Sequence, residues 1–273
     1  MMARPDAFLS RLERFGSIES TQPVVREWLE AGVPEVAVAV ADEQTMGRGR
    51  QGRGWSAPPG TALLASAGFR PQNIQLGHAW RLAAIVALAM ADAAEEVAGL
   101  KDATIWLKWP NDLVADAPDG RLVKLAGVLG ESTSDGASGL VTTAIIGIGI
   151  NADWPAGAFP PELRDSMTSL RELLGGRPID RDALLDAWLA RLEPRYEALR
   201  DGHFDAGGWT ARQRTTGHGV EVDTGGSILT GTGVGVDPES GALLVRGRDG
   251  ATQPVGSGEV VRCRVMTGNL SWR

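Results

Sequence analysis

The segment GRGRQGRGW, residues 47–55, is the feature that most limits how this chain can fold. Its four glycines oppose any regular helix or strand, and its three arginines repel one another. Ordering such a segment costs about 1–2 kcal/mol per residue in backbone entropy. The whole chain has a formal charge of −7, so this cluster of positive charge needs a local reason. We expect a loop that is mobile when empty and becomes ordered when an anion binds.

The composition of the loop indicates that the anion is a phosphate. Glycines let backbone N–H groups approach a phosphate closely, and guanidinium groups bind its oxygens in pairs. The segment also matches G-x-G-x-x-G, but the dinucleotide fingerprint needs a strand that runs directly into a helix, and GWSAPPG follows here. A solvated loop with accidental arginines is the alternative. Trp55 argues against it, because a large apolar ring at the end of the loop needs a surface to pack on.

Composition narrows the class of protein. The chain has 273 residues, 43% of them hydrophobic and 22% charged, which predicts a soluble globular protein with one sizeable core. The longest apolar run, residues 82–91, is too short to span a membrane and predicts a buried helix. The acidic balance argues against broad nucleic-acid binding. Cys263 is the single cysteine, which favours a cytoplasmic location and excludes an internal disulfide.

The order of patterns predicts an α/β (α+β) fold with a central mixed β-sheet flanked by helices. Strands are expected at 36–41, 61–69, 104–109, 112–115, 122–131 and 140–150. Helices are expected at 5–14, 22–32, 75–99, 160–174, 180–200 and 204–213. From Gly217 the chain changes to short strands separated by glycines. We therefore predict two domains, residues 1–216 and a small β-barrel at 217–273.

The segment IWLKWPNDL is a second constellation. Alternation along a strand puts Trp106 and Lys108 on one face, and Pro110 ends regular pairing. Only three of the 27 basic residues are lysine, so a retained lysine suggests a site that needs a compact ammonium group. The segment KLAGVLGE, with Lys124 and Gly127, suggests backbone packed closely against a ligand. A solvated lysine on an edge strand, and glycines that serve only β-packing, remain open alternatives.

Five segments in order resemble the biotin–protein ligase family. They are EST (19–21), QTMGRGRQGRGW (44–55), LKWPNDL (107–113), KLAGVLGE (124–131) and GIGIN (147–151). The resemblance implies the α/β catalytic domain of that family followed by an SH3-like barrel. It also implies that the chain joins biotin to ATP with Mg²⁺, holds biotinyl-5′-AMP and passes biotin to a lysine of a biotin carboxyl carrier protein domain.

The resemblance implies roles for individual residues. Lys108, Arg48 and Arg50 correspond to catalytic positions, and no metal ligand is assigned. The biotin-binding set is Ser20, Thr21, Gln22, Gln44, Arg48, Gly49, Arg50, Lys108, Gly127 and Gly149. The adenylate-binding set is Gly47, Arg48, Arg50, Arg53, Trp55, Asn111 and Asn151. The chain departs from the family at Gln22, where asparagine is frequent, and at Gln51, where arginine or a similar residue is frequent.

Two other functions are compatible with these residues. A lipoate or octanoyl ligase would share the fold, although the arginine segment and KWPND favour biotin. A non-enzymatic regulator that binds biotin would bind without transferring it. About 18 residues precede the first motif, too few for a helix-turn-helix module, so we expect no contact with nucleic acid. A homodimer is possible on the resemblance alone.

Overall fold

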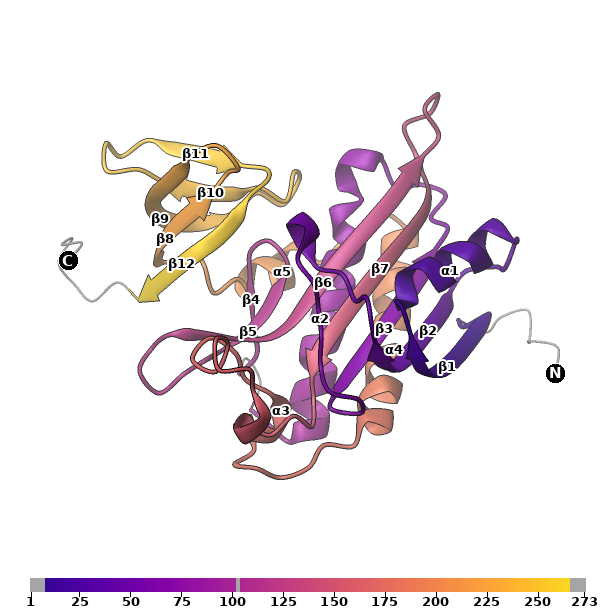
Figure 1. The fold of residues 1–273 in the computed structure, drawn as a ribbon. Helices are drawn as coiled ribbons and strands as arrows, with labels where there is room; N and C mark the ends of the chain where they lie inside the picture. The colour runs from indigo at the N-terminus through magenta and orange to yellow at the C-terminus, as the bar shows by residue number, and fades with distance from the viewer. Residues whose placement is uncertain (1–7, 102–103, 266–273) are drawn as a thin grey trace.

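The computed structural model describes residues 8–101 and 104–265 and contains two β-sheets (Figure 1). The larger sheet has the strand order β1-β2-β3-β7-β6-β5-β4. Its β1–β2 pair is parallel and its other neighbours are antiparallel, which confirms the mixed sheet. The strands are β1 (Arg11–Ile18), β2 (Ala37–Gln44), β3 (Ala62–Phe69), β4 (Trp106–Lys108), β5 (Asp112–Asp116), β6 (Leu122–Ser134) and β7 (Val141–Asn151).

Helices cover the two faces of this sheet unequally. α1 (Thr21–Glu30) packs on β2, β3 and β7. α2 (Trp80–Ala98) and α4 (Arg181–Arg200) pack on each other and cover the opposite face. The two short helices are α3 (Leu170–Leu173) and α5 (Ala206–Ala211). We call the face that carries α1 the cleft face. The segment Leu76–Ala98 is long and apolar enough to cross a membrane, but 56% of its apolar window is buried against the sheet and α4.

The smaller sheet is antiparallel, with the order β11-β10-β9-β8-β12. Its strands are β8 (His218–Asp223), β9 (Ile228–Val236), β10 (Leu243–Arg246), β11 (Thr252–Val255) and β12 (Glu259–Val265). Figure 1 shows this sheet on the side of the larger sheet where β4 and β5 lie. The description of this sheet as an SH3-like barrel, and the domain limit at residue 217, remain predictions.

Two predicted helices are wrong, and pairing explains both. Of the helix predicted at 5–14, residues 5–7 lie outside the described part, and Arg11 begins a strand that pairs with the buried β2. Short helices are marginal alone, so a buried strand that needs a partner decides the conformation. The helix predicted at 160–174 shrinks to α3. The segment before α3 pairs instead with the backbone of Lys124, whose N–H donates to Ser166 O at 2.8 Å and whose carbonyl accepts from Thr168 N at 2.9 Å.

Candidate functional site

Three glycines of β6 and β7 leave the middle of the cleft face bare. Gly127 and Gly149 lie opposite each other in the ladder, and Gly147 shares their face because side chains alternate along a strand. A Cβ at Gly149 would lie 2.5 Å from Trp55 Nε1, and one at Gly147 would lie 3.1 Å from Gln22 Nε2. Other side chains therefore rest directly on the backbone at these positions. We call this surface the glycine floor.

Polar groups at the start of α1 close one end of the floor. Gln44 Oε1 accepts hydrogen bonds from the N–H and the hydroxyl of Thr21 at 2.7 and 3.1 Å. The Thr21 and Ser66 hydroxyls lie 2.7 Å apart, and Gln22 donates to Leu129 O at 2.9 Å. Ser20 occupies the N-cap position but makes no side-chain cap hydrogen bond, and it is 6% exposed. Buried polar groups fixed by one another form a ready-made hydrogen-bonding site.

The arginine segment is a β-hairpin in the structure. Trp55 N donates to Gly47 O at 2.9 Å, and Gly49 N donates to Arg53 O at 2.7 Å. Gln51 and Gly52 form the tip, with φ of 56° and 74°. Two successive residues with positive φ match the type I′ turn, which suits the twist of a hairpin. We call residues 47–55 the arginine hairpin. Whether it moves when empty remains a prediction.

Trp55 joins the arginine hairpin to the glycine floor. Its ring lies against Gly149 and Gly127, and Lys124 Nζ lies 5.5 Å from the ring centroid. The Trp55 Nε1 atom is buried without a hydrogen-bond partner among the described residues. An apolar ring with one unused donor covers the floor, so a ligand that enters the cleft must share this space with the indole.

Two lysines meet at Asp112, beside the floor. Lys124 Nζ lies 2.6 Å from Asp112 Oδ1, and Lys108 Nζ lies 3.3 Å from Asp112 Oδ2. A bulge makes this possible: Leu113 pairs with Ala126 and Val114 with Lys124, so the intervening residue of β6 is unpaired. Without it, alternation would turn positions 124 and 127 to opposite faces. The bulge brings the Lys124 ammonium to 3.4 Å from the position of a Cβ on Gly127.

The arginine hairpin adds two more cations and reaches the smaller sheet. Arg50 donates to Gly258 O at 3.0 Å, and Arg53 donates to Glu259 Oε1 at 2.8 Å. Burial lowers the pKa of the Arg50 guanidinium, while nearby Glu259 and Asp112 act in the opposite direction. The hydrogen bond to Glu259 raises the pKa of Arg53. Four cations therefore surround two carboxylates, which leaves net positive charge next to the floor.

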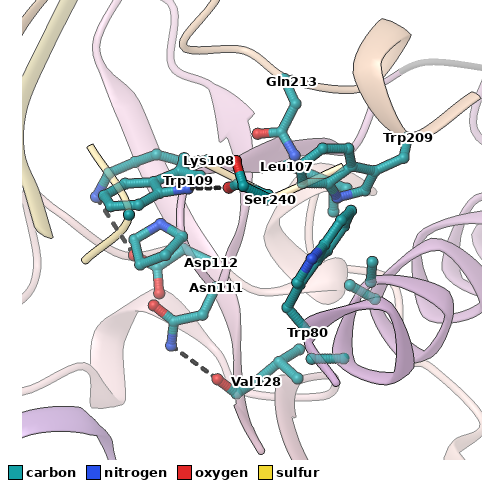
Figure 2. A pocket seen from close by; sticks show the side chains of 16 residues that line it. Trp80, Leu107, Lys108, Trp109, Asn111, Asp112, Val128, Trp209, Gln213 and Ser240 are labelled. Atoms are coloured by element: carbon teal, nitrogen blue, oxygen red, sulfur yellow. Dashed lines mark hydrogen bonds and ion pairs between the residues drawn. The ribbon is translucent and has the colours of Figure 1, made fainter. Parts of the chain in front are cut away.

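A small cavity lies behind the β4–β5 hairpin (Figure 2). It holds about 140 Å³ and includes Lys108 and Asp112 in its wall. Figure 2 shows the rings of Trp80 and Trp209 facing the cavity from α2 and α5. Trp109 donates to Gly241 O at 2.9 Å, which ties the hairpin to the smaller sheet, and Asn111 donates to Val128 O at 2.8 Å. These contacts fix the hairpin that carries Lys108 and Asp112.

Asn151 lies at the end of β7, beyond the floor. Its side-chain N–H donates to Thr168 O at 2.9 Å. Its Oδ1 is a buried acceptor without a partner among the described residues. An unused acceptor of this kind fits a donor on a ligand.

Most of the predicted site residues lie together on one face of the larger sheet. Gly127 and Gly149 form its floor, the α1 residues and Gln44 close one end, and Asn151 lies at the end of β7. The arginine hairpin covers the floor, with the Arg48 side chain exposed. Lys108 is linked to these residues by its ion pair with Asp112. The sequence interpretation left Lys124, Ser66 and Glu259 outside its site set; the rarity of lysine was a signal for Lys124, and no pattern marked the other two.

The cleft offers few ligands for a metal ion. In residues 8–101 and 104–265 there is no group of three or more His, Cys, Asp or Glu side chains placed to bind one. Asp112 and Glu259 already neutralise cations. Mg²⁺ is often held by one or two carboxylates together with substrate phosphates. A Mg²⁺ that arrives with a nucleotide would need few protein ligands, and Asp112 is a carboxylate beside the floor that could supply one.

Comparison with known proteins identifies related chains. The sequence profile of the Biotin/lipoate A/B protein ligase family matches residues 15–151. A biotin--[acetyl-CoA-carboxylase] ligase of Paracoccus denitrificans is 34% identical over 227 residues, which cover 81% of this chain and 89% of the relative. The bifunctional ligase/repressor BirA of Bacillus subtilis is 32% identical, covering 85% of this chain and 68% of the relative. The biotin protein ligase of Aquifex aeolicus, solved with biotin and ATP, superposes with a TM-score of 0.75 at 29% identity, covering 94% and 99% of the two chains.

Proposed function

The chain belongs to the biotin/lipoate A/B protein ligase family, and on that premise we propose that it activates biotin with ATP and transfers it to a lysine of a biotin carboxyl carrier protein domain. The proposal rests on three features that lie together on one face of the larger sheet. They are the glycine floor, the cationic cluster at Asp112 and the arginine hairpin above both. The single cysteine supports a cytoplasmic location, and a homodimer remains a prediction.

Biotin fits the floor and its polar end. The ring system of biotin carries a cyclic urea, which has one strong acceptor and two N–H donors. Buried Thr21 and Ser66, together with half-buried Gln44, offer both donors and acceptors. The sulfur ring and aliphatic chain are apolar and would lie along Gly149 and Gly127, in the space that the Trp55 ring occupies here, so the ring would have to shift when biotin binds. We propose that this arrangement directs the biotin carboxylate toward Lys124.

Adenylate formation requires positive charge held in fixed positions near the α-phosphate. A carboxylate oxygen of biotin attacks the α-phosphorus of ATP, a P–O bond forms, and the bond to pyrophosphate breaks. Negative charge grows on the phosphate oxygens during this step, and preorganised cations stabilise it. We propose that Lys124 is the cation closest to the reacting oxygens, because it lies between Asp112 and Trp55. Lys108 would support it from the other oxygen of Asp112.

Asp112 keeps both ammonium groups in place without neutralising them fully. It is 7% exposed, and each of its oxygens faces one lysine. Mg²⁺ bound to the nucleotide would offset further phosphate charge. Arg48 and Arg50 would close over the adenylate, while the unused acceptor of Asn151 fits a donor of the nucleotide. Covering the mixed anhydride protects it from water until the carrier lysine attacks.

Mass spectrometry of a biotin carrier domain tests the function directly. The protein is mixed with the domain, ATP, Mg²⁺ and biotin, and the carrier should gain the mass of one biotin. Parallel reactions with lipoate and octanoate test the choice of acid, and pyrophosphate release reports the first step alone. Release with lipoate but not with biotin would contradict the proposal. Binding of biotin with neither release nor transfer would indicate a regulator.

A further inference from the structure

The start of β12 holds the arginine hairpin at two points. Both terminal nitrogens of Arg53 bond to the two carboxylate oxygens of Glu259, with the Nη1–Oε1 distance at 2.8 Å. Arg50 donates to the carbonyl of the preceding residue, Gly258, at 3.0 Å. The partners are about two hundred positions apart in sequence. Figure 1 shows the hairpin lying between β6 and the smaller sheet. The smaller sheet is thus in contact with the cleft.

The backbone at Gly258 is shaped for this contact. Its φ is +147°, and a Cβ there would lie 2.6 Å from Asp223 O, so a residue with a side chain would not fit. The carbonyl that receives Arg50 is therefore presented by a backbone that only glycine accommodates readily. The two arginines also differ. Arg53 uses two donors in a forked pair with a carboxylate and a third on Arg50 O, whereas Arg50 is half-buried and donates only to this carbonyl among the described residues.

We propose that Glu259 is a positioning residue: by clasping Arg53 it anchors the arginine hairpin to the smaller sheet, so that Arg50 is held over the cleft to meet an anionic ligand. The clasp itself does not depend on the proposed function. Its effect on the adenylate rests on that function. Arg53 then acts as an anchor, and the phosphate contacts belong to Arg50 and Arg48.

Limited trypsin digestion of the ligand-free full chain tests the clasp. Trypsin cleaves after arginine, so opening of the hairpin exposes the bonds after Arg48 and Arg50. Glu259→Gln should raise cleavage there about fivefold, as expected for loss of one well-formed, partly exposed ion pair. Glu221→Gln is the matched control, because it breaks the Arg262–Glu221 pair of the same sheet, away from the hairpin. Equal cleavage in the Glu259→Gln variant and the parent protein would overturn the clasp.

The dissociation rate of biotinyl-5′-AMP tests the consequence for the cleft. Glu259→Gln and Arg53→Gln should each raise the rate about fivefold, and the double variant should be no faster than either single one. The charge-reversed pair Arg53→Glu with Glu259→Arg should restore most of the retention. Additive effects of the single variants, or no rescue by reversal, would overturn the positioning role. If the protein formed no adenylate at all, the digestion result would stand and the proposed function would fail alone.

Discussion

The glycine floor and the tip of the arginine hairpin use the same amino acid for opposite reasons. In the floor, Gly127 and Gly149 lie in a paired ladder, and what matters is the missing Cβ, because Trp55 occupies that space. In the hairpin, Gly52 has a φ of 74° and no heavy atom within 4 Å of a Cβ, so what matters is backbone freedom. The same residue therefore serves a flat surface in the floor and a tight turn at the tip of the hairpin. Movement of the hairpin, and with it of the charges of Arg50 and Arg53, remains a prediction.

Replacing the lysines that contact Asp112 should have the largest effect on the rate of adenylate formation. Lys124→Ala should lower the rate of biotin-dependent pyrophosphate exchange about a thousandfold, as for loss of one preorganised group that stabilises developing charge. Lys108→Ala should lower it less, because its ammonium faces the other oxygen of Asp112. Biotin binding by calorimetry should change little in both. A larger loss for Lys108→Ala would return the central role to that lysine, as the sequence alone predicts.

Filling the floor should give the next largest effect. Gly149→Ala puts a methyl group where the Trp55 ring lies, so the ring must leave and the seat for biotin becomes shallower. We expect biotin affinity to fall about thirtyfold, equivalent to about 2 kcal/mol at 1.4 kcal/mol per tenfold. Gly130→Ala is the matched control: it lies on the opposite face of β6, where a Cβ would lie 3.0 Å from Ile146 Cδ1, the end of a flexible side chain. Equal losses in both variants would show that the floor is structural.

Removing a charge from the arginine hairpin should have a smaller effect, seen in the release of biotinyl-5′-AMP. Arg50→Ala should speed release of biotinyl-5′-AMP about tenfold, which corresponds to about 1.4 kcal/mol for a charge-assisted hydrogen bond. The melting temperature should stay close to that of the parent protein, because the hairpin lies outside the core. Unchanged retention of the intermediate in a filter-binding or fluorescence assay would show that the hairpin does not grip the adenylate.

Easing the turn of the hairpin should have the smallest effect. Gln51 holds a φ of 56°, a conformation that glycine adopts without the cost paid by other residues. Gln51→Gly should favour the hairpin turn by up to about 1 kcal/mol, an amount offset in part by greater freedom of the open loop. Release of biotinyl-5′-AMP should slow about twofold to threefold. Faster release would mean that the turn differs when the ligand is bound.

The sequence predicts the glycine floor better than it predicts the contacts of the arginine hairpin. Strand patterns and the spacing of glycines identify β6 and β7, because alternation follows directly from backbone geometry. The pairing of Lys124 with Asp112 was not predictable, since it depends on a bulge that leaves no clear sequence mark. The same holds for Glu259, which reaches the hairpin from a strand about two hundred residues later. The strand at Arg11–Ile18 was missed because β2, rather than local propensity, determines it.

Amide hydrogen exchange of the floor and the arginine hairpin should be measured with and without biotinyl-5′-AMP. Residues 145–151 should exchange slowly in both states, because they lie in a buried ladder. Residues 47–55 should exchange faster without the ligand and gain at least about tenfold protection when it is bound. Equal exchange of residues 47–55 in both states would mean that the arginine hairpin does not close over the bound adenylate.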